Sequence, residues 1–279
     1  MTDAWARYRE VRGIAYANWM GFAWPLRVLT AVGFAGFIAL LAQLSLPLPW
    51  TPVPFSFQPL AVLVTGACLG RNYALLSVAV YLGAGAVGLP VFAEGEGGLD
   101  ALTGSTAGYL FGFAAAAYLV GWYVERRRRL LDRRWAVGLA AALGALALAA
   151  LVTLTWIAFQ GGRFESAWSA TESLLWLFLG LAVLGAVAAA WLILQARGER
   201  WERLNLFLAM MAAIALIHLC GVVVLKPSLG VGWSEAVALG STVFLPFDLV
   251  KAGLATAATA IFLPSSSAPS SSAGGKPHA

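Results

Sequence analysis

Charged side chains are scarce in this sequence of 279 residues. Asp, Glu, Lys and Arg make up 11% of the chain, whereas a soluble domain has roughly 25%. Hydrophobic residues make up 61%, and the mean hydropathy is +0.81. So little polar surface cannot cover a water-soluble globule. The composition therefore excludes the soluble class and indicates helices that lie in lipid.

Cysteine and histidine are nearly absent as well. The two cysteines, Cys68 and Cys220, both lie in apolar stretches, and there are two histidines. This excludes a disulfide framework and leaves almost no candidates for a catalytic metal site. We interpret the cysteines as small buried residues. We interpret His218 as a packing residue inside a helix rather than a ligand contact.

Several catalytic motifs are missing from the chain. It has no G-x-x-x-x-G-K-[ST], no H-E-x-x-H and no G-x-S-x-G. The chain therefore supplies no phosphate-binding loop of its own, and we expect no cofactor and no metal. The net charge of +5 is interpreted through membrane sidedness rather than as a sign of nucleic-acid binding.

Eight apolar runs predict membrane helices. They fall at residues 26–46, 58–70, 73–92, 105–124, 135–160, 171–196, 205–225 and 247–263. Two are short for the ~20 residues that a span needs, which suits helices packed inside a bundle. Gly70, Arg71 and Asn72 separate the second run from the third, so we predict a tight turn between two helices there.

The basic residues select an orientation. With the N-terminus in the cytoplasm and eight alternating spans, every Lys and Arg falls in a cytoplasmic segment except Arg163, Lys226 and Lys251. This segregation obeys the positive-inside rule. We predict an all-α polytopic membrane protein with eight spans and both ends inside. Residues 1–24 form a cytoplasmic leader, and the Ser-, Pro- and Gly-rich residues 264–279 form a disordered tail.

Three stretches of the chain carry motifs in a set order. They are PLPWTPVPFSFQPLAVLVTGACLG (47–70), YALLSVAVYLGAGAVGLPVFAEGEGGLDALTGSTAGYLFGF (73–113) and FLPFDLVKAGLATA (244–257). They resemble the BioY family of biotin-binding subunits, with its PVPFTLQ-like loop, YLLLGAIGLPVF-like helix end, GPTGGYLLGF-like helix start and PGDLLK-like last helix start. This sequence has Ser105, Ala107 and Phe247 where the family usually has Pro, Gly and Gly.

The resemblance implies a fold and partners. It implies the six-helix bundle of an energy-coupling-factor (ECF) transporter S component, built from residues 25–124 and 205–263. Residues 125–204 have no counterpart in the usual member. We interpret them as an insertion of two extra transmembrane helices, which leaves the sidedness of the later helices unchanged. The resemblance further implies biotin uptake across the cytoplasmic membrane with a transmembrane coupling subunit and two ATPase subunits.

Asp248 and Lys251 are an acid and a base inside one predicted span. At positions i and i+3 they share a helix face. Pro246 suits the first turn of a helix, where the helix dipole favours Asp248. Ionisable groups in a span are costly and indicate function. The resemblance implies that the pair contacts biotin. The alternative is an ion pair that merely stabilises the helix start.

Gln58, Tyr81 and Tyr109 are further candidate ligand contacts. An amide can both donate hydrogen bonds to a ureido group and accept them from it, and tyrosine rings suit the apolar bicycle of biotin. The alternatives are a helix cap or lipid-headgroup contact for Gln58, and helix packing or an interfacial belt for the tyrosines.

Two loops and one helix face complete the candidate features. The proline-rich loop 47–57 and the glycine-rich loop 93–104 both fall on the predicted outer side. Together they could form a lid that excludes water, or they could be plain connectors. Ala31, Ala35 and Ala39 form a small-xxx-small face. The family resemblance assigns this face to docking of the coupling subunit, and chance spacing in an Ala-rich chain is the alternative.

These features together predict a biotin-binding subunit rather than an enzyme. Two alternative functions are considered for the chain. One is a related subunit for thiamine, riboflavin or folate. The other is a membrane enzyme acting on a lipid, for which the sequence lacks clustered acids or His–Ser pairs near the inner face.

Overall fold

The computed structural model describes residues 23–131 and 200–262. Within them the chain is mostly helical, as the sequence predicts. The long helices are α2 (Trp24–Ala42), α3 (Gln58–Ala86), α5 (Ala107–Leu131), α9 (Arg200–Leu229) and α11 (Leu245–Phe262). The predicted helices 135–160 and 171–196, most of the leader and the tail lie outside the described residues.

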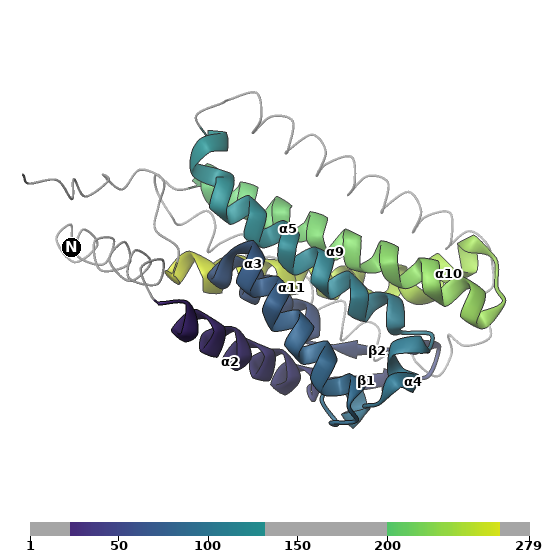
Figure 1. Ribbon diagram of the computed structural model, residues 1–279. Helices are drawn as coiled ribbons and strands as arrows, with labels where there is room; N and C mark the ends of the chain where they lie inside the picture. The colour runs from purple at the N-terminus through teal and green to yellow at the C-terminus, as the bar shows by residue number, and fades with distance from the viewer. Residues whose placement is uncertain (1–22, 132–199, 263–279) are drawn as a thin grey trace, which may run out of the picture.

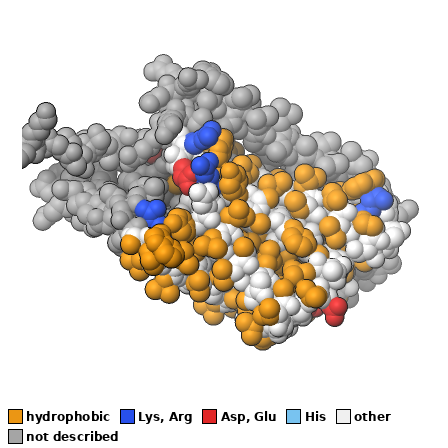
Figure 2. Space-filling view, viewed as in Figure 1, with side chains coloured by type: hydrophobic (Ala, Val, Ile, Leu, Met, Phe, Trp, Pro, Cys, Tyr) orange, Lys and Arg blue, Asp and Glu red, His pale blue; other side chains and the backbone are white. Residues whose placement is uncertain are grey.

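Five stretches of the described residues have the length and composition of membrane spans. They are Trp24–Ala42, Gln58–Ala86, Ala107–Arg126, Glu202–Leu229 and Trp233–Ala260. Figure 2 shows one face of the molecule, on which hydrophobic side chains predominate and the few charged ones lie toward its edges. Such a face suits contact with lipid.

α3 is two helices joined by a sharp turn at Gly70. Gly70 has a non-helical backbone with φ 74° and ψ 172°. Gln58 and Tyr81, 23 residues apart, are hydrogen-bonded through their side chains. In one straight helix they would be about 35 Å apart. The chain therefore reverses at Gly70, which confirms the predicted turn.

The proline-rich segment that the sequence predicts as a loop contains a β-hairpin. β1 (Ser45–Leu48) pairs antiparallel with β2 (Thr51–Ser56), with Ser45 opposite Ser56. Proline cannot donate to a ladder, but edge strands tolerate it, and in this two-stranded sheet both strands are edges. The interpretation of residues 47–57 as a loop is therefore wrong for most of this segment.

The segments between the long helices also contain short helical elements. η1 (Ala93–Gly95) and α4 (Leu99–Thr103) lie between α3 and α5. α10 (Trp233–Gly240) and η2 (Thr242–Phe244) lie between α9 and α11. In Figure 1 the hairpin, α4 and α10 lie at one end of the long helices, and the C-terminal end of α5 lies at the other.

The long helices pack in pairs around one core. α3 packs against α2, α5 and α11, and α9 packs against α5 and α11. Gly108 and Gly112, one turn apart on α5, allow α9 to approach closely: a Cβ at Gly108 would collide with the carbonyl of Cys220, and one at Gly112 would crowd Ile217. This close contact brings the residues of α5 and α9 to a shared cavity.

Candidate functional site

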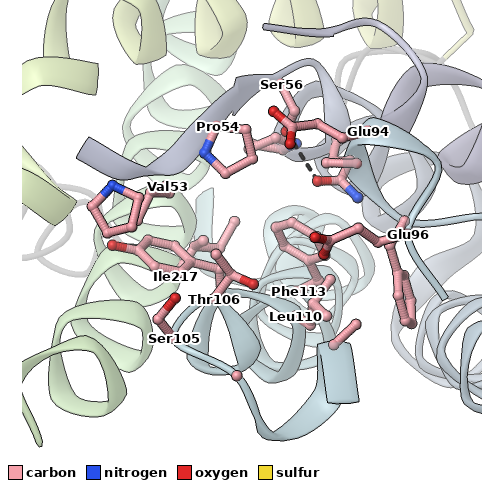
Figure 3. A pocket seen from close by; sticks show the side chains of 18 of the residues that line it. Val53, Pro54, Ser56, Glu94, Glu96, Ser105, Thr106, Leu110, Phe113 and Ile217 are labelled. Carbon is pink, nitrogen blue, oxygen red and sulfur yellow. Dashed lines mark hydrogen bonds between the residues drawn. The ribbon is translucent and has the colours of Figure 1, made fainter. Parts of the chain in front are cut away.

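A cavity of about 400 Å³ opens at the end of the bundle that carries the hairpin. This volume is in the range of small-molecule sites. Its lining comes from β2, the start of α3, the α3–α5 connection, α5, α9, and η2 with α11. In Figure 3 the hairpin residues Val53, Pro54 and Ser56 face Thr106, Leu110 and Phe113 across the cavity.

Asp248 and Lys251 meet at the cavity wall, on the shared helix face that their spacing predicts. They are buried, with exposed fractions of 1% and 3%, and both line the cavity. Lys251 Nζ donates to Asp248 Oδ1 over 3.1 Å. The helix begins at Leu245, which places Asp248 in its first turn. The helix dipole favours a carboxylate there.

His218 is the second partner of the Asp248 carboxylate. Its Nε2 lies 2.6 Å from Asp248 Oδ2, and its Nδ1 lies 3.1 Å from the carbonyl oxygen of Gly240. His218 is buried and lines the cavity. The sequence-based interpretation of a satisfied packing histidine is therefore incomplete. The local sequence carries no signal for the pairing, because 30 residues separate the two partners.

Phe55 connects the hairpin to α11 at the charged pair. The Lys251 ammonium lies 4.5 Å from the centroid of the Phe55 ring, a favourable cation–π distance. The same ring meets Phe247 edge-on at 5.0 Å between centroids. Phe247 is one of the departures from the family pattern, and here its ring packs against the hairpin.

Gln58 and Tyr81 form a hydrogen-bonded pair beside the cavity. Ser56 Oγ donates to Gln58 Oε1 over 3.0 Å, and Gln58 Nε2 donates to the hydroxyl of Tyr81. Gln58 lines the cavity, whereas Tyr81 is not among the lining residues. Tyr81, 1% exposed, thus lies behind Gln58 and holds its amide in place.

Tyr109 lines the cavity from α5. Its hydroxyl donates to the carbonyl oxygen of Gly240 over 2.6 Å. Its ring meets the His218 ring edge-on at 6.1 Å between centroids. The tyrosine ring therefore forms part of the wall and also supports the histidine.

Both predicted outer loops contribute to the cavity. Glu94, Glu96 and Asp100, from η1, α4 and the residues between them, line it together with the hairpin. The N–H of Glu94 donates to Ser45 Oγ over 2.9 Å, which ties η1 to β1. The two segments thus meet at one cavity, and their motion as a lid stays a prediction.

The structure places most of the Ala31, Ala35 and Ala39 repeat inside the chain. Ala31 and Ala35 are 0% and 5% exposed and belong to the hydrophobic core, and Ala39 packs partly buried against it. The predicted docking face is therefore covered by other residues of this chain. The open side of α2 instead carries residues such as Leu29, Val32, Gly33, Gly36 and Leu40.

The described residues contain no group of three His, Cys, Asp or Glu side chains that could hold a metal ion. The cavity lining combines apolar side chains with polar and charged ones, among them Gln58, Asp248 and Lys251. Such a lining binds and orients a small molecule.

Comparison with known proteins relates the chain to one family. A model of the BioY family matches residues 20–200 and 183–266. A biotin transporter BioY of Thermotoga maritima is 43% identical over 103 residues, which are 37% of this chain and 60% of that protein. A biotin transporter BioY of Rhodobacter capsulatus is 41% identical over 121 residues, 43% of this chain and 60% of that protein.

The chain spans less than two thirds of the length of these curated relatives. A crystal structure of the S component for biotin from an ECF-type ABC transporter has a similar fold. Its TM-score is 0.54 at 17% identity, and the match covers 84% of this chain and 89% of the other. The similarity to this structure is one of fold.

Proposed function

Because this chain belongs to the BioY family, we propose that it binds biotin in the cavity between the hairpin and α11. We further propose that it serves biotin uptake as the S component of an ECF-type transporter. The names of its relatives support the substrate. The observation that carries the proposal is the buried cluster of Asp248, Lys251 and His218 at the wall of the cavity.

The polar groups retain hydrogen-bonding capacity that suits a ureido ring. Each oxygen of Asp248 accepts one protein hydrogen bond and has a further lone pair. Lys251 has three donors, one of which goes to Asp248. Gln58 keeps one N–H and one lone pair beyond its contacts with Ser56 and Tyr81. The ureido group of biotin has two N–H donors and one carbonyl acceptor, which this set can satisfy.

The apolar wall suits the rest of the molecule. Val53, Leu110, Phe113, Ile217 and Phe244 line the cavity. They can bury the thioether ring and the aliphatic chain, since apolar area removed from water stabilises binding.

Transport needs partners that lie outside this chain. The sequence has no phosphate-binding loop, so we assign the energy supply to two ATPase subunits coupled through a transmembrane subunit. We propose eight spans in the cytoplasmic membrane with both ends inside. Under this topology the cavity opens outward, and Arg126 lies at the cytoplasmic end of α5.

Biotin binding to the purified chain tests the proposal. We expect saturable binding in isothermal titration calorimetry, and none with thiamine, riboflavin or folate. Asp248→Asn and Lys251→Met each break a buried charge-assisted contact, which costs about 2–5 kcal/mol, or about thirtyfold to several thousandfold in Kd. Lys226→Met is the matched control, because Lys226 packs over Trp233 and not in the cavity.

Thermal stability of each variant is measured without biotin, so that loss of binding is separated from loss of folding. Wild-type affinity in a folded Asp248→Asn or Lys251→Met variant would show that this cluster does not recognise biotin. Binding of another vitamin in place of biotin would assign the chain to a different substrate.

A further inference from the structure

His218 contacts more of the site than a packing residue requires. It lies on α9, and its two ring nitrogens reach two different segments: the Asp248 carboxylate on α11 and the backbone carbonyl of Gly240 at the end of α10. Both are acceptors, so both contacts are hydrogen bonds when the ring carries a proton on each nitrogen. The imidazole therefore links three elements at the cavity wall.

The ring itself is held on both sides. Phe244 stacks against it with centroids 6.2 Å apart and an angle of 22° between the planes, and Tyr109 meets it edge-on. Its position is thus set by packing, by the Gly240 carbonyl and by the carboxylate. A side chain restrained in this way can in turn restrain the group that it touches.

The Asp248 carboxylate depends on two donors from two helices. Lys251 holds Oδ1 from the same helix, one turn along, and His218 holds Oδ2 from α9. With one donor alone the carboxylate can rotate about its Cβ–Cγ bond, because this torsion is soft. With both, the plane of the carboxylate is set, and so are the directions of its remaining lone pairs.

We propose that His218 is the positioning residue of this cavity: its Nε2–H fixes the carboxylate of Asp248 so that the free lone pairs of that carboxylate point at the N–H donors of the ligand. This inference rests on the proposed function, since the ligand is the ureido group of biotin. His218 acts through Asp248, so its effect requires the aspartate.

Two substitutions separate the contacts of the ring. In His218→Gln the amide nitrogen can take the place of Nε2 and donate to Asp248. In His218→Asn the shorter side chain places its amide near the Nδ1 position, within reach of Gly240 but not of the carboxylate. We expect biotin Kd to stay within about threefold of wild type in His218→Gln and to rise about tenfold to a hundredfold in His218→Asn, because the latter loses a hydrogen bond to a charged group.

The same two substitutions are then made in an Asp248→Asn background. We expect them to change the Kd of that background by less than about threefold, because residues that act through one another are not additive. Calorimetry gives the Kd, and thermal unfolding without biotin reports the folding of each variant. Rescue of affinity by Gln and loss of the effect in the Asp248→Asn background together support the inference.

Each of the following outcomes would overturn it. Equal weakening by Gln and Asn would make His218 a packing residue, as would wild-type affinity in both. Additive effects in the Asp248→Asn background would show that His218 acts independently of the aspartate. If Asp248→Asn alone leaves affinity unchanged, the proposed site fails and the inference fails with it. If Asp248→Asn weakens binding and His218→Asn does not, the inference alone fails.

Discussion

Three ionisable side chains form one buried cluster in this membrane protein. Asp248 and Lys251 are almost fully buried, and His218 is 7% exposed. Burying an ion pair costs desolvation energy, and the attraction between the two charges offsets it only in part. A protein with apolar side chains of similar size in place of the pair is therefore often equally stable or more stable. Stability alone therefore does not account for this cluster, which supports its proposed role in ligand recognition.

If the cluster serves recognition, a variant without it should fold well and not bind biotin. Replacing the whole cluster with apolar residues (His218→Leu, Asp248→Leu and Lys251→Met) should leave the free energy of unfolding unchanged or raise it by about 1–4 kcal/mol. Biotin binding should be lost. The single change Asp248→Leu leaves the buried Lys251 ammonium without its carboxylate partner and should cost about 3–5 kcal/mol. Chemical denaturation and calorimetry measure both effects. A strongly destabilised triple variant would instead make the cluster a structural element.

Among the helices, α3 depends on one glycine for its reversal. Gly70 adopts φ 74° and ψ 172°, a region that is essentially restricted to glycine. Its α-carbon faces the Glu125 carboxylate, into which a Cβ would project. Glu125 accepts the backbone N–H of Arg71 over 2.9 Å and pairs with its guanidinium. The turn and its partner on α5 thus hold the two halves of α3 antiparallel.

Gly70→Ala should therefore lower the free energy of unfolding by about 1–3 kcal/mol from backbone strain alone, with a further loss from displacing Glu125. Gly83→Ala is the matched control in the same helix, because a Cβ there meets nothing within 4 Å. The control should be neutral or stabilising by about 0.5–1 kcal/mol. Thermal and chemical unfolding in detergent measure both. An unchanged Gly70→Ala variant would contradict the reversal as described here.

α2 has one buried face and one exposed face. Ala35 is buried in the core, whereas Gly36 is exposed with open space around it. Ala35→Trp should overpack the core, which typically costs about 1–3 kcal/mol or more, and should impair folding and biotin binding together. Gly36→Trp should leave both intact. If the coupling subunit docks on the open face of α2, Gly36→Trp should still abolish uptake in cells that contain the partner subunits.

Binding by the purified variants and uptake in cells separate these effects. Normal uptake with Gly36→Trp would place the partner on another surface. Normal binding with Ala35→Trp, together with lost uptake, would restore the docking role that the family resemblance implies for the alanine repeat.

The long helices can be predicted from the sequence, because a long apolar run that crosses lipid must satisfy its own backbone hydrogen bonds, and a helix does so. The hairpin cannot be predicted in the same way. Pro52 and Pro54 lack the N–H groups that donate hydrogen bonds between strands, so the sequence of β2 resembles that of a loop. α10 has eight residues, too few for the pattern of a span. Asp248 and Lys251 are found because local helical spacing relates them. No spacing relates His218 to Asp248, so their contact depends on how α9 and α11 pack.

Within the described residues, the cavity and the C-terminal part of α5 lie at opposite ends of the bundle. The cavity with Glu94, Glu96 and Asp100 lies at one end, and the C-terminal part of α5, which contains Arg126, lies at the other (Figure 1). Basic residues favour the cytoplasmic side of a membrane, whereas acidic ones contribute little to orientation. The polarity of the bundle therefore supports a cavity that opens away from the cytoplasm.

Cysteine accessibility tests this orientation and the insertion together. Cys68 and Cys220 are first changed to Ala, and single cysteines are then placed at the exposed positions Glu96 and Arg126 and at Arg163, within the predicted insertion. In intact cells an impermeant thiol reagent should label the cysteines at 96 and 163. The cysteine at 126 should react only after the membrane is opened, because it lies on the cytoplasmic side. Labelling at 96 without labelling at 163 would retain the orientation of the bundle and reject the two added spans, and labelling at 126 in intact cells would reverse the orientation.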